Sequence, residues 1–184
     1  MDLARDLAAG RFLSAAAEWL LDNFHVVTEG LSAVERDLPA TYYRQLPALA
    51  VRAHAGHARI YAIALELIRH SDSRLDEQQM LQFLRSFQRV APLTIGELWA
   101  WPSMVKLALV ENLRRLADEL MHARVVRQAA DAYLEHASAT PGARPIDLPS
   151  PLAPDFAVQL LHRLREYGLG LTGVRVALDQ HLAA

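Results

Sequence analysis

The chain has 184 residues and a mass of 20.5 kDa, and its 52% hydrophobic content is enough to fill the core of one globular domain. Lys and Arg number 19 against 21 Asp and Glu, so the net charge of -2 offers no basic surplus for binding nucleic acid. The sequence has no cysteine, which excludes disulfides, thiolate nucleophiles and cysteine metal sites and suits a reducing compartment.

The N-terminal sequence MDLARDLAAGRF does not resemble a signal peptide. It carries acidic residues where a signal peptide needs a positive region followed by an apolar run. No later stretch approaches the roughly 20 apolar residues of a membrane-spanning helix. We therefore expect a cytoplasmic protein without a membrane span.

A first helix is predicted between Ser14, which is suited to cap it, and Pro39, which ends it. Its apolar stripe has helical spacing and consists of Leu20, Phe24, Val27, Leu31, Val34 and Leu38. Asn23 falls on this stripe, where an unpaired amide would be costly, so we expect its side chain to bond another segment.

A second apolar stripe runs between Pro47 and His70, although Gly56 is as compatible with a break as with a continuous helix. A third helix is predicted to begin at Asp76, with Gln79 placed for a capping box. Its inward-facing residues are predicted to be Met80, Phe83, Leu84 and Phe87.

Thr94 and Glu97 form another capping-box pattern and open a long helical pattern that fades near Ala137. Its apolar positions are Leu98, Val105, Leu109, Leu113, Leu116 and Leu120. Pro102 lies inside this pattern and is expected to kink or divide the helix.

The proline-rich stretch SATPGARPIDLPSPLAP indicates a linker, because repeated proline removes donors and opposes helix. A helix to Gly168 and a short helix after Thr172 are expected beyond it. We predict an all-α bundle of about five to seven helices, including one long kinked helix. The predicted domains are a helical core at 1–137, the linker at 138–154 and a C-terminal helical appendage at 155–184.

Metal-ligating side chains occur at helical spacing in two places. Asp22, His25 and Glu29 could share a helix face and hold a divalent ion in a small metal-dependent hydrolase, but the same pattern is typical of a solvated charged face. His54 and His57 would share a face with Tyr61 if the helix were continuous there, and a third ligand would be needed. The nearest candidates for that ligand are His70, Asp72 and Asp76.

Other chemical motifs are weak. Trp99 and Trp101 could stack on sugar rings if exposed, although tryptophan more often lies in a core. Glu97 favours a capping role over a catalytic one, and Glu111 with the arginines of ENLRR is typical of ordinary helix ion pairs. The sequence contains no GxSxG elbow, P-loop or GxGxxG motif, so no cofactor is expected.

Four longer stretches occur in a characteristic order: WLLDNFH, DLPATYYRQLP, RIYAIALELIRHSDSRLD and PLTIGELWAWPSMVKLALVENLRRLA. Together they resemble the N-terminal cytoplasmic region of the cyclic β-1,2-glucan synthases, which are large bacterial inner-membrane glycosyltransferases. The resemblance runs from about Ala17 to Ala117, and FAVQLLHRLRE also fits it. Ala58 departs from the pattern, since many relatives have proline there.

The resemblance implies a parent enzyme that builds and cyclises glucan from UDP-glucose, whereas this chain carries no nucleotide-sugar motif. We therefore expect a noncatalytic regulatory or assembly domain whose partners are the other synthase domains, in the same chain or a separate one, and possibly β-1,2-glucan. Such a domain should expose an apolar or aromatic patch. The candidate interaction or structural residues are Trp19, Asn23, His25, Arg44, Gln45, Glu97, Trp99 and Trp101.

The resemblance also suggests a sharper alternative, in which a tyrosine hydroxyl anchors the growing glucan. Tyr42 and Tyr43 are the preferred candidates, because Pro39 and Pro47 flank them and suggest an accessible connection. The competing interpretation is that both rings pack a junction between helices.

Overall fold

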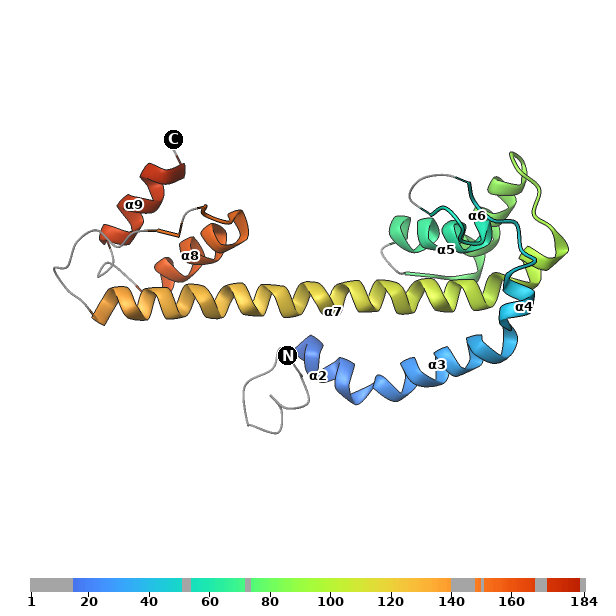
Figure 1. Ribbon diagram of the computed structural model, residues 1–184, viewed down its shortest axis with the longest axis horizontal. Helices are drawn as coiled ribbons and strands as arrows, with labels where there is room; N and C mark the ends of the chain where they lie inside the picture. The colour runs from blue at the N-terminus through green and yellow to red at the C-terminus, as the bar shows by residue number, and fades with distance from the viewer. Residues whose placement is uncertain are drawn as a thin grey trace. The chain divides into compact units, whose positions relative to one another are not determined.

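The computed structural model describes residues 15–50, 54–71, 74–139, 148–149, 151–167 and 172–182. These residues form eight helices and no strand beyond one isolated bridge between Ala48 and Ala58, so the all-α prediction is confirmed (Figure 1). The helices are α2 (Ala15–Asp22), α3 (Phe24–Asp37), α4 (Ala40–Tyr43), α5 (Arg59–His70), α6 (Glu77–Gln88), α7 (Ile95–Ala139), α8 (Pro154–Tyr167) and α9 (Thr172–Leu182).

The number of helices exceeds the predicted five to seven because the first predicted helix is interrupted and a four-residue helix, α4, follows it. The interruption is at Asn23, whose amide donates to the Trp19 carbonyl at 2.8 Å, while the Thr28 hydroxyl donates to the His25 carbonyl at 2.8 Å. Side chains that bond nearby carbonyls compete with the regular helix ladder. Asn23 thus bonds its own preceding helix instead of a distant segment.

The apolar stripe predicted for this region is buried only at its C-terminal end, at Val34 and Leu38. Phe24, which was predicted to face the core, is exposed instead, as are Trp19 and Val26. The stripe residues Leu20, Val27 and Leu31 are half-buried. Helical periodicity shows that a stripe exists but not how fully neighbouring segments cover it.

The helical pattern between Pro47 and His70 is interrupted at Gly56, which was one of the two alternatives that the sequence allowed. Gly56 has φ +82°, in the left-handed region that favours glycine. The Leu49 N–H donates to the His57 carbonyl at 2.9 Å and the Arg59 N–H donates to the Pro47 carbonyl at 2.7 Å, so the two arms of the turn are tied together. Helix α5 therefore begins at Arg59.

The predicted cap of α6 is present, and α7 passes through the proline that was expected to kink or divide it. Asp76 caps α6 by accepting from the Gln79 N–H at 2.7 Å. Helix α7 is continuous through Pro102, so the proline does not divide it. Proline has no N–H, so the Leu98 carbonyl receives no hydrogen bond from Pro102. Because Pro102 is exposed, water can solvate that carbonyl instead.

The chain divides into two compact units, Met1–Ala117 and Asp118–Ala184. In unit 1, α5 and the first part of α7 supply the fully buried side chains Ile60 and Met104, and α6 contributes Leu84. Met80, Phe83 and Phe87 pack against this core, as the period of the third predicted helix indicated.

Unit 2 has a separate core in which the last part of α7 packs with α8 and α9. Its buried residues are Ala130, Leu134, Ala137, Ala157, Leu160, Leu164, Val174 and Leu178. Between α7 and α8, the Arg163 Nε donates to Asp131 at 2.5 Å and His122 lies 2.6 Å from Asp155.

The packing divides the chain between 117 and 118, because the end of α7 buries its apolar side chains in unit 2. The predicted domain boundaries at 138 and 154 stay a prediction. Residues 140–147 and 150 of the predicted linker lie outside the described part of the chain. Over the described ranges, no helix combines the length and the apolar character needed to cross a membrane.

Candidate functional site

Glu97 is the centre of a polar network at the start of α7. Its side chain is 0% exposed, and its two carboxylate oxygens accept from Arg59, from Nε at 2.8 Å and from Nη2 at 2.7 Å. The carboxylate also accepts from the Thr94 N–H at 2.9 Å and from the Thr94 hydroxyl at 3.0 Å. The Glu97 N–H donates back to that hydroxyl at 3.2 Å, so the predicted capping box is present.

Burial by itself raises the pKa of Glu97, but the hydrogen bonds from Arg59 and Thr94 outweigh it and hold the pKa below its ordinary value. The same carboxylate raises the pKa of Arg59, so both groups stay ionised. Arg59 also donates to the Pro92 carbonyl at 3.0 Å and so ties α5 to the connection before α7. We interpret Glu97 as a structural anion, because the donors around it leave no approach for a substrate.

Tyr42 and Tyr43 are half-buried, and both hydroxyls form hydrogen bonds within unit 1. Tyr42 donates to the Gly96 carbonyl at 2.5 Å, and the Ala58 N–H donates to the Tyr43 hydroxyl at 3.1 Å. These bonds join α4 to the starts of α7 and α5. Both rings also pack against the core of unit 1.

The two hydroxyls should differ in their effect on stability. Tyr43→Phe leaves the buried Ala58 N–H without an acceptor and should cost about 1–3 kcal/mol. Tyr42→Phe should cost about 1 kcal/mol or less, because the Gly96 carbonyl lies within α7, where helical bonding is available to it. Urea unfolding of both variants measures the difference, and equal losses would contradict it.

Attachment of glucan to Tyr42 would remove the proton that its hydroxyl donates to the Gly96 carbonyl, and attachment to Tyr43 would crowd the oxygen that accepts from the Ala58 N–H. The acceptor role therefore stays a prediction outside the function proposed below. Intact-mass analysis of the chain beside an active synthase tests it, and the absence of a hexose ladder would exclude it.

The remaining sequence candidates lie mainly on the surface. Trp19 is exposed on α2, and Arg44 and Gln45 are exposed at the end of α4. His25 is exposed on α3, with its Nδ1 3.2 Å from the Asp22 carbonyl oxygen. The structure does not bring these four side chains together with Glu97.

The proposed metal ligands Asp22, His25 and Glu29 are all exposed, and the interruption at Asn23 places the first on α2 and the other two on α3. Among the residues that the structure describes, no group of three or more His, Cys, Asp or Glu side chains is arranged to hold a metal ion. The hydrolase alternative therefore has no geometric support in the described residues.

The two tryptophans of TIGELWAW lie on opposite sides of α7. Trp101 is buried in the core of unit 1, whereas Trp99 is 78% exposed. The buried side of this helix start follows one helical stripe, made by Glu97, Ala100, Trp101, Met104, Val105 and Ala108. Leu98, which the sequence assigned to the inward stripe, lies outside it.

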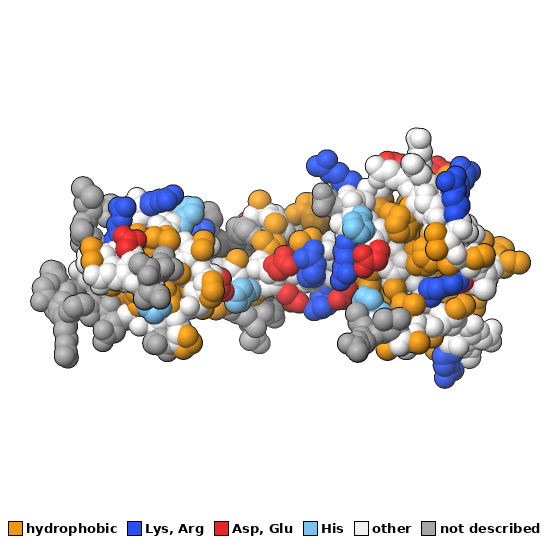
Figure 2. Space-filling view, turned by 90° about the horizontal axis from the view of Figure 1, so that it is seen from above, with side chains coloured by type: hydrophobic (Ala, Val, Ile, Leu, Met, Phe, Trp, Pro, Cys, Tyr) orange, Lys and Arg blue, Asp and Glu red, His pale blue; other side chains and the backbone are white. Residues whose placement is uncertain are grey.

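The exposed side of the same helix start is also apolar. Ile95 is 75% exposed, Leu98 is 41% exposed, and with Trp99 they have the i, i+3 and i+4 spacing of one helix face. Val90, in the connection from α6, is 88% exposed. We call Val90, Ile95, Leu98 and Trp99 the α7-start face, and Figure 2 shows hydrophobic side chains gathered at the right-hand end, over this part of unit 1.

A second feature of unit 1 is a cavity of about 270 Å³ between the turn before α5, α5 itself and the middle of α7. His57 stacks on Tyr61 with ring centroids 5.9 Å apart, and His54 meets His57 edge-on at 6.3 Å. The other lining residues, which include polar and apolar side chains, are Leu65, Ile68, Arg69, Glu111, Asn112 and Arg115. We call it the His57–Tyr61 cavity.

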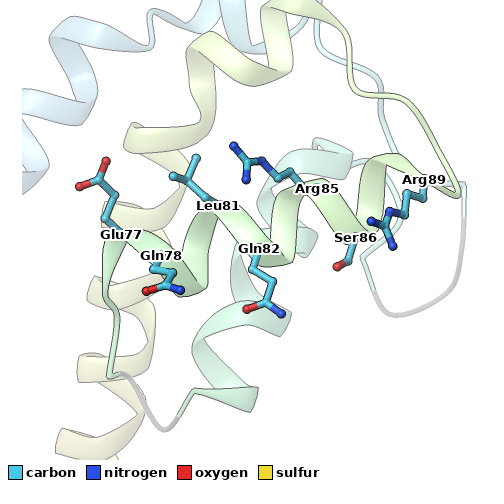
Figure 3. Close-up of a pocket in the computed structure, with 7 residues that line it drawn as sticks. All are labelled: Glu77, Gln78, Leu81, Gln82, Arg85, Ser86 and Arg89. Carbon is cyan, nitrogen blue, oxygen red and sulfur yellow. The ribbon is translucent and has the colours of Figure 1, made fainter.

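A larger groove of about 670 Å³ lies along α6. The side chains drawn for it in Figure 3 project from α6 and, for Arg89, from the residue that follows it, and all are exposed. They are Glu77, Gln78, Leu81, Gln82, Arg85, Ser86 and Arg89. Because the described lining comes from one helix and no second element faces it, we do not assign a site there.

Three features were missed from the sequence. The first is the pairing of Arg59 with Glu97. Arg59 is the first residue of α5, where the helix dipole disfavours a cation, so an arginine there could have indicated an acidic partner. An exposed apolar patch was expected, but the sequence assigned Leu98 to the inward stripe, because apolar residues lie on both sides of the helix start. The partners of His57 and Tyr61 across the cavity come from α7 and are distant in sequence.

No family model matches the chain. The chain is 38% identical over 169 residues to a Rhizobium meliloti (strain 1021) protein named cyclic beta-(1,2)-glucan synthase NdvB. The match covers 89% of this chain but spans 6% of the length of that protein. The resemblance predicted from the motifs is thereby confirmed as similarity to one segment of such a synthase.

Proposed function

We propose that this chain is a noncatalytic assembly segment of a cyclic β-1,2-glucan synthase and that its α7-start face docks against another part of that synthase. The similarity to a small segment of a much longer relative supports the first part. The exposed apolar surface at the start of α7 supports the second.

The observation that carries the docking proposal is that the start of α7 has large apolar side chains both on its buried side and on its exposed side. One side packs in the core of unit 1 through Trp101 and Met104, and the other carries Ile95 and Trp99 into solvent. A helix that is hydrophobic all round is normally buried on all sides. Clustered exposed apolar side chains on a protein mark interaction sites, and exposed tryptophan is a frequent binding hot spot.

We infer that the parent enzyme makes cyclic glucan from UDP-glucose and that this segment lies on its cytoplasmic side, as the family resemblance implies. A noncatalytic role agrees with the side chains that the sequence offered for chemistry. The Glu97 carboxylate is paired with Arg59, and the hydroxyls of Tyr42 and Tyr43 form hydrogen bonds within unit 1.

A direct test measures binding of the labelled chain to the synthase from which this segment has been deleted. Trp99→Ala and Leu98→Ala should weaken binding, with about thirtyfold expected for the tryptophan if it is a hot spot of about 2 kcal/mol. Neither variant should unfold the chain, since both side chains are exposed.

Leu116→Ala is the matched control for Leu98→Ala. Both leucines lie on α7 and both are 41% exposed, but Leu116 is outside the α7-start face. Its truncation should leave binding unchanged. Failure of the unaltered chain to bind, or equal losses for the two leucine variants, would reject the docking proposal.

A further inference from the structure

The His57–Tyr61 cavity shares no residue with the α7-start face and has a different chemical character. One wall is made of the stacked rings of His57 and Tyr61, and Leu65 and Ile68 add apolar surface beside them. Polar groups come from α7, at Glu111, Asn112 and Arg115.

These polar groups form hydrogen bonds with their neighbours on α7. Glu111 accepts from Arg114 through both oxygens, at 3.0 Å and 2.8 Å, and the Arg115 Nη2 donates to the Asn112 Oδ1 at 2.9 Å. The hydrogen bond from Arg114 lowers the pKa of Glu111, so its carboxylate remains an acceptor at neutral pH. Burial, followed by the nearby Glu111 charge, raises the pKa of Tyr61, so its hydroxyl stays protonated and can donate.

We propose that the His57–Tyr61 cavity binds one pyranose unit of a neutral sugar. Aromatic and apolar surfaces suit the C–H face of a pyranose, while a carboxylate, an amide and a guanidinium together supply the acceptors and donors that vicinal hydroxyls need. Ligand sites are commonly built in this way, from an apolar lining and a few convergent polar groups.

Other ligand classes fit the cavity less well. A phosphate requires donors alone, and the ionised Glu111 carboxylate would repel it. Two nearby arginines already pair with carboxylates, Arg69 with Glu66 at 3.0 Å and Arg114 with Glu111, and Arg115 donates to the Asn112 side chain. Within the described ranges, no group of three metal-ligating side chains lies here.

The size of the cavity limits the ligand to a single ring. Its volume of about 270 Å³ falls just below the range of about 300–1,000 Å³ that holds drug-sized ligands. The unit could be a free monosaccharide or one residue of a glucan chain, and the chemistry that recognises the two is the same.

Titration of the whole chain, followed by amide and side-chain NMR shifts, tests the proposal. Glucose, the β-1,2-linked glucose disaccharide and inorganic phosphate are added separately. A sugar should shift the resonances of residues 54–61 and 111–115 with a dissociation constant of about 1 mM, as expected for a small ligand. Equal binding of the two sugars assigns the site to a free unit, and preference for the disaccharide assigns it to a chain.

His57→Ala and Glu111→Gln should each weaken sugar binding about three- to tenfold, because they remove a ring face and a charged acceptor. His70→Ala is the control, since it removes an exposed histidine of α5 that does not line the cavity, and should change binding by less than about twofold. Trp99→Ala should also leave sugar binding intact, so the outcome is independent of docking. No shift at these residues with either sugar, or a stronger shift with phosphate, would overturn the proposal.

Discussion

Arg59→Met should lower the stability of unit 1 by about 3 kcal/mol, because it leaves the Glu97 carboxylate buried without its cation. Glu97 is 0% exposed, so water cannot replace the lost donors without opening the start of α7. For a unit of this size the loss corresponds to a fall in Tm of roughly 10 °C. Thermal and urea unfolding of the chain measure both quantities.

Arg69→Met is the matched control, since it breaks the pair with Glu66 on the same helix, where both side chains are largely exposed. Its cost should stay below about 0.5 kcal/mol. Replacing Arg59 and Glu97 together by methionine should recover much of the loss, because no unpaired charge then remains buried. If Arg59→Met and Arg69→Met proved equally mild, the network would not be a major source of stability.

The stability loss of Arg59→Met should depend on pH in a defined direction. In the unaltered chain the pKa of Glu97 lies below its ordinary value of 4.5, so its contribution is present above that value and is lost as the pH falls through the folded pKa. Without Arg59, its hydrogen bond and its charge no longer lower the pKa of Glu97 against the effect of burial, so this pKa is higher in the variant than in the unaltered chain. The difference between the two proteins should therefore be largest near about pH 7 and shrink toward about pH 4.

The sequence predicts the helices of this chain where the periodic pattern and the caps agree. Asp76 and Thr94 begin α6 and α7 where their side chains indicated, and Gly56 interrupts the helical pattern before α5. The interruption at Asn23 was not predicted, because it results from side chains bonding nearby carbonyls inside an otherwise regular pattern.

The candidate sites were less predictable because their residues come from distant segments. The Thr94 and Glu97 cap is local, but its cation, Arg59, lies on another helix. The His57–Tyr61 cavity is lined by two rings from one segment and by Glu111 from α7. Residues so far apart in the chain form no recognisable sequence motif. Exposure of Trp99 and burial of Trp101 could not be distinguished either, since the surrounding helix start is apolar on both sides.

Leu160→Ala should unfold unit 2 while unit 1 stays folded. Leu160 is fully buried among residues of α7, α8 and α9, and its truncation should cost about 2–5 kcal/mol. A small unit with one modest core has only a few kcal/mol of stability to lose. The cores of the two units share no residue, so amide hydrogen exchange should rise in α8 and α9 and remain slow in α5.

Val158→Ala is the control for this variant, because Val158 lies on the same helix and is 62% exposed. Its truncation should leave exchange in both units within error, as surface substitutions usually cost less than about 0.5 kcal/mol. If Leu160→Ala instead raised exchange throughout α5 and α6, the two cores would unfold as one. The continuous helix α7 would then couple them, and the division at Ala117 would describe packing but not independent stability.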